Sequence, residues 1–159
     1  MSADLTIALE PRPSAADCER VLDGVRSHNR RHAAPPNFAP LAVFARDAGG
    51  TLVGGLVGET GWEWLHVQLL WVSESLRGRG VGRRLLRSAE AEAATRGCRQ
   101  AYLDTLDFQA RPFYEREGYT LFGVQDDYPP GHQRFFLHKP LPGAGAGERP
   151  GPFIILHVR

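Results

Sequence analysis

Three glycines at alternate positions separate an apolar run from a segment with helical periodicity. The apolar run covers residues 69–72, the glycines are Gly78, Gly80 and Gly82, and the helical pattern follows without a spacer. Glycine has no Cβ, so a ligand can approach the backbone closely, and the first amides of a helix have no carbonyl partner. These amides and the helix dipole favour an anion. The pattern therefore predicts a phosphate-binding loop.

Two common phosphate loops do not fit this stretch. A Walker loop requires Gly-Lys-Ser/Thr at its end, whereas Gly82 is followed by Arg83. A dinucleotide-binding fingerprint would require its third glycine at position 83, which is again arginine. The loop therefore has to serve another phosphate ligand.

A second motif lies downstream, at residues 107–119. Together with Arg77-x-x-Gly80-x-Gly82 it resembles the Gcn5-related N-acetyltransferases, the GNAT family. Arg77-x-x-Gly80-x-Gly82 is similar to the Arg/Gln-x-x-Gly-x-Gly/Ala loop with which family members bind the pyrophosphate of acetyl-CoA. Residues 107–119 resemble the family segment Asn-x-x-Ala-x-x-Leu-Tyr-Glu-Lys-x-Gly-Phe. The matching residues are Ala110, Tyr114, Glu115 and Gly118; the departures are Asp107, Phe113 and Arg116. The resemblance covers roughly residues 1–141 and is close from Gly61 onward.

The resemblance implies a fold and a co-substrate. The fold would be α/β, of the α+β type, with a mixed, mostly antiparallel sheet of six to seven strands that is splayed between the fourth and fifth strands and flanked by helices. Acetyl-CoA would be the co-substrate, without a metal. At position 107 the family usually has an asparagine that bonds the pantetheine arm. The residues implied to contact the cofactor are Leu70, Trp71, Val72, Arg77, Gly78, Arg79, Gly80, Val81, Gly82, Arg83 and Asp107.

Acetyl transfer to an amine requires a base for the amine and benefits from an acid for the departing thiolate. Tyr114 aligns with the tyrosine that protonates the thiolate in many family members, so the resemblance implies that Tyr114 is the general acid. His66 on the central strand is the best candidate for the base, because histidine titrates near neutral pH; a half-buried structural histidine is the other interpretation. The carboxylates that remain alternatives are Glu59, Glu63, Asp126 and Asp127.

Residues for an amine acceptor are predicted around the same cleft. Asp126 and Tyr128 lie in the loop of the last hairpin and could hold a cationic amine by charge and aromatic contact, with Trp64 in the cleft wall. An ordinary solvated turn is the alternative for the loop. His28 and His32 stand four residues apart but have no third ligand nearby, so no metal site is predicted.

Hydrophobic periodicity and turn residues predict the order of the elements. The expected strands are 4–10, 41–47, 51–57, 62–72, 100–106, 119–125 and 134–139, and the expected helices begin at 14, 82 and 109. The run 69–72 breaks the alternation of the central strand and predicts a bulge there, which in the family splays this strand from its parallel neighbour.

Length and composition indicate one domain, residues 1–141, followed by a Gly/Pro linker and an apolar strand-like tail, residues 142–159. The resemblance implies that this domain is an acetyltransferase. The apolar tail favours a homodimer. The N-terminus has no signal pattern, no window is apolar enough for a membrane span, and Cys18 and Cys98 fit buried, reduced thiols. A cytoplasmic protein without a membrane partner is therefore predicted.

The sequence favours an N-acetyltransferase of the EC 2.3.1 type that acts on a primary amine of a small molecule or peptide. The alternative is a non-catalytic acyl-CoA-binding sensor or interaction module on the same fold. A third hypothesis, contact with nucleic acid, rests on an arginine cluster around the glycine loop, and the net charge of +1 argues against it. The cluster comprises Arg77, Arg79, Arg83, Arg84 and Arg87.

Overall fold

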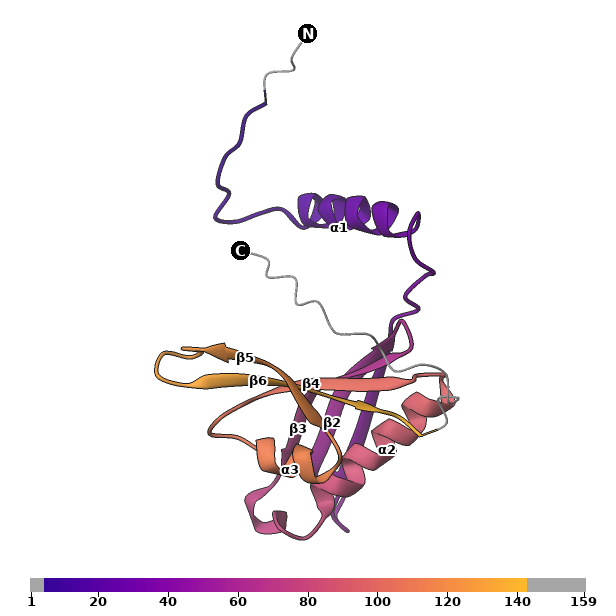
Figure 1. The fold of residues 1–159 in the computed structure, drawn as a ribbon, viewed down its shortest axis with the longest axis vertical. Helices are drawn as coiled ribbons and strands as arrows, with labels where there is room; N and C mark the ends of the chain where they lie inside the picture. Colours follow the sequence, from indigo (N-terminus) through magenta and orange to yellow (C-terminus); the bar gives the residue numbers. More distant parts are fainter. Residues whose placement is uncertain (1–4, 143–159) are drawn as a thin grey trace. The chain divides into compact units, whose positions relative to one another are not determined.

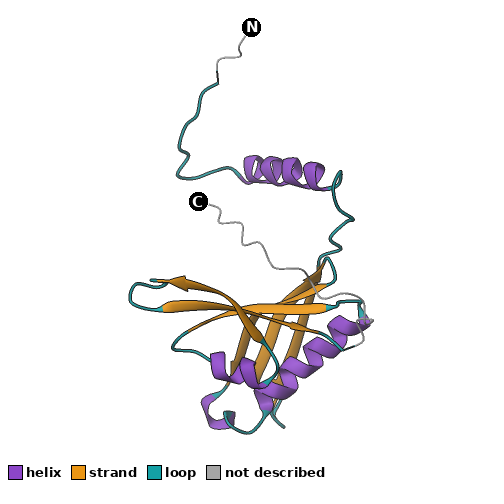
Figure 2. Ribbon diagram, in the orientation of Figure 1, coloured by secondary structure: helices purple, strands orange, loops and turns teal. Residues whose placement is uncertain are grey.

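The computed structural model describes residues 5–142, and the chain divides into two compact units, one up to Pro35 and one from Pro36 onward (Figures 1 and 2). The division into a domain of residues 1–141 and a tail of residues 142–159 stays a prediction. The predicted apolar strand of that tail lies outside the described residues.

Among its described residues, 5–35, the first unit contains one regular element, the helix α1 (Ala15–Asn29). It begins where the sequence predicts, because the hydroxyl of Ser14 accepts a hydrogen bond from the Asp17 amide at 3.0 Å. The strand predicted over residues 4–10 is wrong for the described residues 5–10, which are irregular. A strand needs a paired neighbour, and residues 5–35 offer only a helix. Cys18 is exposed on α1, contrary to prediction.

The second unit is built on a six-stranded sheet in the order β1-β2-β3-β4-β6-β5. The strands are β1 (Ala39–Arg46), β2 (Leu52–Gly61), β3 (Trp64–Val72), β4 (Gln100–Leu106), β5 (Thr120–Asp126) and β6 (Gln133–Pro140). Only β3 and β4 pair in parallel, and every other neighbouring pair is antiparallel. The predicted fold class, a mixed and mostly antiparallel sheet, is therefore confirmed.

The turn from β2 to β3 is shorter than the sequence suggests. Trp62 and Glu63 both have positive φ angles, 46° and 61°, and they form a two-residue turn. Such turns require positive φ at both central residues, a geometry that usually selects glycine or asparagine. Since neither residue type is present, the predicted strand 62–72 includes the turn, and the strand begins at Trp64.

The sheet splits between β3 and β4, the fourth and fifth strands of the prediction. Their parallel pairing ends at Val67 and Leu103, although both strands continue beyond these residues. Directly after Val67, β3 carries one extra residue, Gln68, relative to β2. This bulge lies next to the predicted run 69–72. A Cβ at Gly58 of β2 would collide with the His66 carbonyl oxygen, so the glycine makes room for the bulged backbone.

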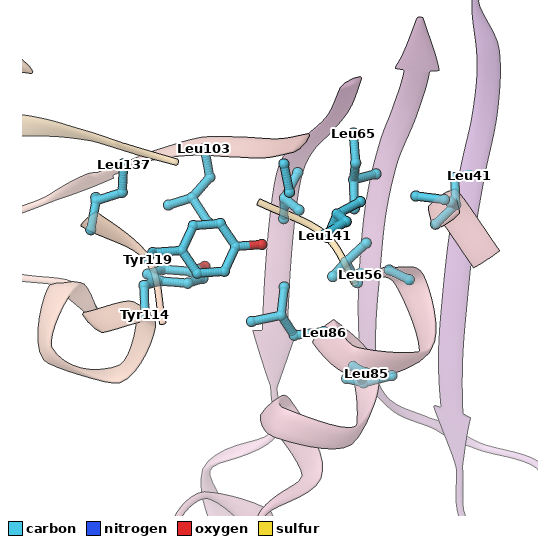
Figure 3. Packing of buried hydrophobic residues seen from close by; sticks show 14 of the residues in the cluster. Leu41, Leu56, Leu65, Leu85, Leu86, Leu103, Tyr114, Tyr119, Leu137 and Leu141 are labelled. Carbon is cyan, nitrogen blue, oxygen red and sulfur yellow. The ribbon is translucent and has the colours of Figure 1, made fainter. Parts of the chain in front are cut away.

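The described part of the second unit, residues 36–142, also contains two helices and a short 3₁₀ turn: η1 (Glu74–Leu76), α2 (Val81–Thr95) and α3 (Arg111–Arg116). The residues that α2 buries include Val81, Leu85, Leu86, Ala89 and Ala93. They belong to one core with Leu56 of β2 and Leu65 of β3, so α2 covers this face of the sheet (Figures 1 and 3). The alanines allow close approach of helix and sheet. Cys98, which follows α2, is buried as predicted.

Candidate active site

The glycine loop adopts the conformation that its residue types favour. Gly78 and Gly80 have φ angles of 73° and 75°, a region that other residues rarely adopt, and Gly80 caps the start of α2. The Arg77 amide donates to Glu74 at 3.2 Å, and the Arg84 amide donates to Gly80 at 3.1 Å. Between them, the amides of residues 78–83 have no backbone acceptor in the part of the chain that the structure describes. These amides form an anion-binding surface at the start of α2.

A cavity of about 550 Å³ lies beside these amides. It is lined by Leu70, Val72, Leu76, Arg77, Gly78, Gly80, Val81, Gly82, Arg83, Ala110, Phe113, Tyr114 and Arg116. The lining thus comes from the end of β3, from the loop with the start of α2, and from α3. None of it comes from β4, because β4 has diverged from β3 at this level. On the β3 side, the cavity lies beyond Val67, where the pairing with β4 has ended.

The backbone of β3 presents polar groups to the gap. The Ser73 amide donates to the Val53 carbonyl at 2.9 Å, on the side of β2. Successive residues of a strand direct their amide and carbonyl groups to opposite sides. The groups of Val72 and Leu70 therefore point toward the gap, and the Val72 carbonyl indeed accepts from the Arg77 Nε at 3.2 Å. The Arg77 side chain thereby fixes the loop to the end of β3.

Tyr114 of α3 is buried among apolar residues, yet it lines the cavity. Burial, with a smaller contribution from the nearby charge of Asp104, raises the pKa of Tyr114 to about 12. Its hydroxyl makes no hydrogen bond to another of residues 5–142. The group is therefore protonated at neutral pH and available to a molecule in the cavity.

A second tyrosine packs against the first and has a different role. The rings of Tyr119 and Tyr114 meet edge to face, with centroids 5.9 Å apart. Figure 3 shows the two side chains next to each other. The Tyr119 hydroxyl donates to Glu90 of α2 at 2.9 Å, and Lys139 of β6 donates to the same carboxylate at 2.8 Å. Burial, then the adjacent Glu90 charge, raises the pKa of Tyr119. The buried network of Tyr119, Glu90 and Lys139 therefore packs against Tyr114 through the Tyr119 ring. The sequence analysis did not predict this network.

A second buried carboxylate joins α3 to α2. Glu117, whose side chain is 2% exposed, accepts from the Arg83 Nε at 2.6 Å and from the Arg87 Nε at 3.2 Å. Burial alone would raise the pKa of Glu117, but the hydrogen bonds and charges of the two arginines outweigh it and lower the pKa. The arginine cluster was noticed in the sequence, whereas its partner 30 and 34 residues away was not.

The candidate base lies on the other face of the sheet. His66 alternates with Leu65 and Val67, which are buried toward α2, so its side chain faces away from that helix. Its ring stacks on Tyr102 at 4.4 Å, and its Nδ1 is 3.9 Å from a Glu59 oxygen. Trp64 on the same face contacts Tyr102 edge to face at 5.9 Å. His66 is one residue before the end of the parallel pairing, at the edge of the split.

Other predicted site residues have protein partners and do not line the cavity. Asp107 accepts from the Gln133 amide at 3.3 Å and lies 3.0 Å from the His132 Nδ1. Asp126 accepts from the Gln133 side chain at 2.7 Å, and the Arg134 guanidinium lies over the Tyr128 ring at 5.0 Å.

Two loop and strand residues of the prediction also lie outside the cavity lining. Trp71 alternates with Leu70 and Val72 and is half exposed, and Arg79 lies between the loop glycines. Among residues 5–142 there is no group of three or more metal-ligating side chains, and no helix is long and apolar enough to cross a membrane.

Comparison with known proteins agrees with this arrangement. The model of the acetyltransferase (GNAT) family matches residues 10–119, so the chain belongs to that family. A blasticidin-S acetyltransferase of Streptomyces morookaense is 49% identical over 106 residues, covering 64% of this chain and 78% of that protein. An acetyltransferase of Agrobacterium fabrum is 37% identical over 125 residues, covering 78% and 91% respectively.

A solved structure extends the agreement to the fold. The crystal structure of an acetyltransferase from Bacillus cereus has 31% identity and a TM-score of 0.78, covering 84% of this chain and 98% of that one. The family uses an acyl-CoA as co-substrate. Fold, site and relatives together make this chain an N-acetyltransferase.

Proposed function

We propose that the chain transfers an acetyl group from acetyl-CoA to a primary amine of a small molecule or peptide, by direct attack, with Tyr114 as general acid. The observation that carries the proposal is the juxtaposition of two features in one cavity. The unpaired amides of residues 78–83 offer sites for a diphosphate, and Tyr114, whose hydroxyl has no hydrogen-bond partner among the described residues, lines the same cavity.

The lining of the cavity, which comes from the loop, the end of β3 and α3, supports a ligand arm that runs past Gly82. A Cβ at Gly82 would stand 3.6 Å from the Phe113 ring and 3.7 Å from Val72, so even a small side chain would fill the space between them. The arm of acetyl-CoA would run from the loop past Gly82 toward the end of β3. There the amides of Leu70 and Val72 would donate hydrogen bonds to the thioester oxygen as it becomes negative.

Tyr114 and His66 are proposed to carry out the two proton transfers. As the amine nitrogen attacks, the carbon–nitrogen bond forms and the carbon–sulfur bond breaks. Tyr114 gives its proton to the departing thiolate, and its raised pKa keeps that proton in place until the sulfur becomes basic. We assign the proton lost by the amine to His66, at the edge of the split, with the negative charge of Glu59 beside it.

The acceptor is proposed to be a cationic or amine-bearing small molecule. The relative from Streptomyces morookaense is named for acetylation of blasticidin-S, which makes that antibiotic the first acceptor to test. Trp64, Asp126 and Tyr128 are the proposed acceptor contacts. Binding there would exchange the present contacts of Asp126 with Gln133 and of Tyr128 with Arg134 for contacts with the acceptor.

The test is a thiol-release assay with acetyl-CoA and a panel of amines that includes blasticidin-S, with products identified by mass spectrometry. The proposal predicts stoichiometric release of CoA and acetylated amine. His66→Gln should lower turnover, because the amine then loses its proposed proton acceptor. Saturable acetyl-CoA binding without any acetylated product across the panel would instead support a binding module.

A further inference from the structure

Arg83 and Arg87 stand one helical turn apart on α2 and share the buried carboxylate of Glu117. The carboxylate is 2% exposed, whereas the two arginine side chains are 53% and 65% exposed. Each arginine uses its Nε, the inner edge of the guanidinium, for this contact. The inner edges are therefore fixed, and the outer parts of both groups reach the surface.

The outer donors of these arginines are free in the described residues. A guanidinium has five N–H groups, and the four on the two Nη atoms of each arginine have no acceptor among residues 5–142. The pair carries two positive charges, and the one compensating negative charge is buried beneath it. An arginine held by its Nε presents its Nη groups in a fixed fork, which suits the oxygens of a phosphate.

The two arginines differ in their relation to the cavity. Arg83 lines the cavity beside the unpaired amides, whereas Arg87 lies beyond its lining. Four residues of an α-helix advance by about 6 Å, so Arg87 offers a second phosphate site about that distance along α2 from the first. A diphosphate alone would not require it. A co-substrate that carries a further phosphate, on the ribose next to its diphosphate, has a second group for the site at Arg87.

We propose, on the basis of the proposed use of acetyl-CoA, that Arg87 binds the 3′-phosphate of the co-substrate and that Glu117 is the positioning residue that holds Arg87 for this contact. Arg83 then binds the diphosphate and Arg87 binds the 3′-phosphate. The site thereby selects CoA esters over their 3′-dephospho forms. Glu117 acts only through the arginines and does not touch the ligand.

Calorimetric titration with CoA and with 3′-dephospho-CoA tests this selection without any need for an acceptor. One charge-assisted contact to a phosphate should change Kd by about tenfold or more. The unchanged protein should therefore bind CoA about tenfold more tightly than dephospho-CoA. Arg87→Gln should weaken CoA binding by a similar factor and leave dephospho-CoA binding within about twofold, which brings the ratio of the two Kd values close to one.

Arg84→Gln is the matched control. Arg84 is an exposed neighbour on α2 without a side-chain partner among the described residues, so its replacement removes the same charge and should preserve the Kd ratio. Glu117→Gln should reduce the ratio, because the Nε groups lose their charged acceptor. Arg87→Gln leaves Glu117 paired with Arg83, so the variant should fold, and its Tm verifies this.

The outcomes separate this inference from the proposed function. Equal Kd values for the two ligands in the unchanged protein, or a ratio that survives Arg87→Gln, would overturn the assignment while acetyl-CoA use stands. Absence of any CoA binding would overturn both.

Discussion

Replacement of Tyr114 by phenylalanine removes the proposed acid and little else. The hydroxyl has no hydrogen-bond partner among the described residues, so its loss leaves no buried protein group unsatisfied. We expect the free energy of unfolding to change by less than about 0.5 kcal/mol. Acetyl-CoA affinity should also be retained, because the amides of residues 78–83 are untouched. The effect should be confined to proton transfer.

The expected kinetic loss follows from that role. Proton transfer by a positioned acid contributes about 10²–10⁴-fold, so kcat of Tyr114→Phe should fall by about that factor, or about 3–5 kcal/mol in the barrier. In the unchanged enzyme, a Tyr114 pKa of about 12 means that deprotonation of this residue should not reduce kcat on the alkaline side until the pH approaches that value. Stopped-flow measurement of thiol release across pH gives both quantities.

Tyr119→Phe is the matched control, since the two tyrosines are in contact and only one lines the cavity. Its hydroxyl donates to the buried Glu90, so its loss should cost about 1.5–3 kcal/mol of unfolding free energy. That corresponds to a fall in Tm of about 2–4 °C per kcal/mol. Tyr114→Phe should therefore lose turnover and keep its stability, whereas Tyr119→Phe should lose stability and keep its turnover. Normal turnover in Tyr114→Phe, or an equal kinetic loss in both variants, would refute the assignment of the acid.

Three further predictions concern the backbone and the buried charges. Gly80→Val should raise the Kd for acetyl-CoA about tenfold or more by calorimetry. Gly131→Val, with a similarly positive φ but outside the cavity, should destabilise the protein by about 1–2 kcal/mol without altering this affinity. Equal affinities in the two variants would count against diphosphate binding by the amides of residues 78–83. Gly58→Ala should lower stability by about 1–3 kcal/mol in urea denaturation, because the new Cβ meets the His66 carbonyl oxygen at the bulge; an unchanged midpoint would show that the bulge is not constrained there. The folded-state pKa of Glu117 is lowered, so its stabilising contribution is present at neutral pH and is lost as the pH falls through that pKa. The difference in unfolding free energy between the unchanged protein and Glu117→Gln should thus shrink on acidification, and a difference that grows would contradict the pairing.

Local patterns were enough to predict much of the second unit. The bounds of β4 agree with the expected strand 100–106, and the glycines at 78 and 80 adopt the positive φ that their residue type permits. Both depend on sequence neighbours alone. The broken alternation at 69–72 also predicted the bulge, although its extra residue, Gln68, precedes that run.

Other features depend on partners that are distant in the sequence. The alternation of Leu5, Ile7 and Leu9 is that of a strand, but it cannot state whether another strand is there to pair with it. The turn at Trp62 and Glu63 has no glycine to mark it.

The charge networks and the strand order are equally hidden from local patterns. Glu117 with Arg83, and Glu90 with Lys139, join residues 34 and 49 positions apart. The insertion of β6 between β4 and β5 is likewise a property of the whole sheet.

The central claim is that the amides of residues 78–83 hold the diphosphate of acetyl-CoA and direct the thioester toward the amides of Leu70 and Val72 in the gap between β3 and β4. Amide chemical shifts measured by NMR during titration with CoA and with acetyl-CoA test it most directly. The account predicts large shifts at residues 78–83 with both ligands, and shifts at Leu70 and Val72 that differ between them because only acetyl-CoA carries the carbonyl oxygen. Shifts centred elsewhere, or identical responses of Leu70 and Val72 to the two ligands, would contradict it.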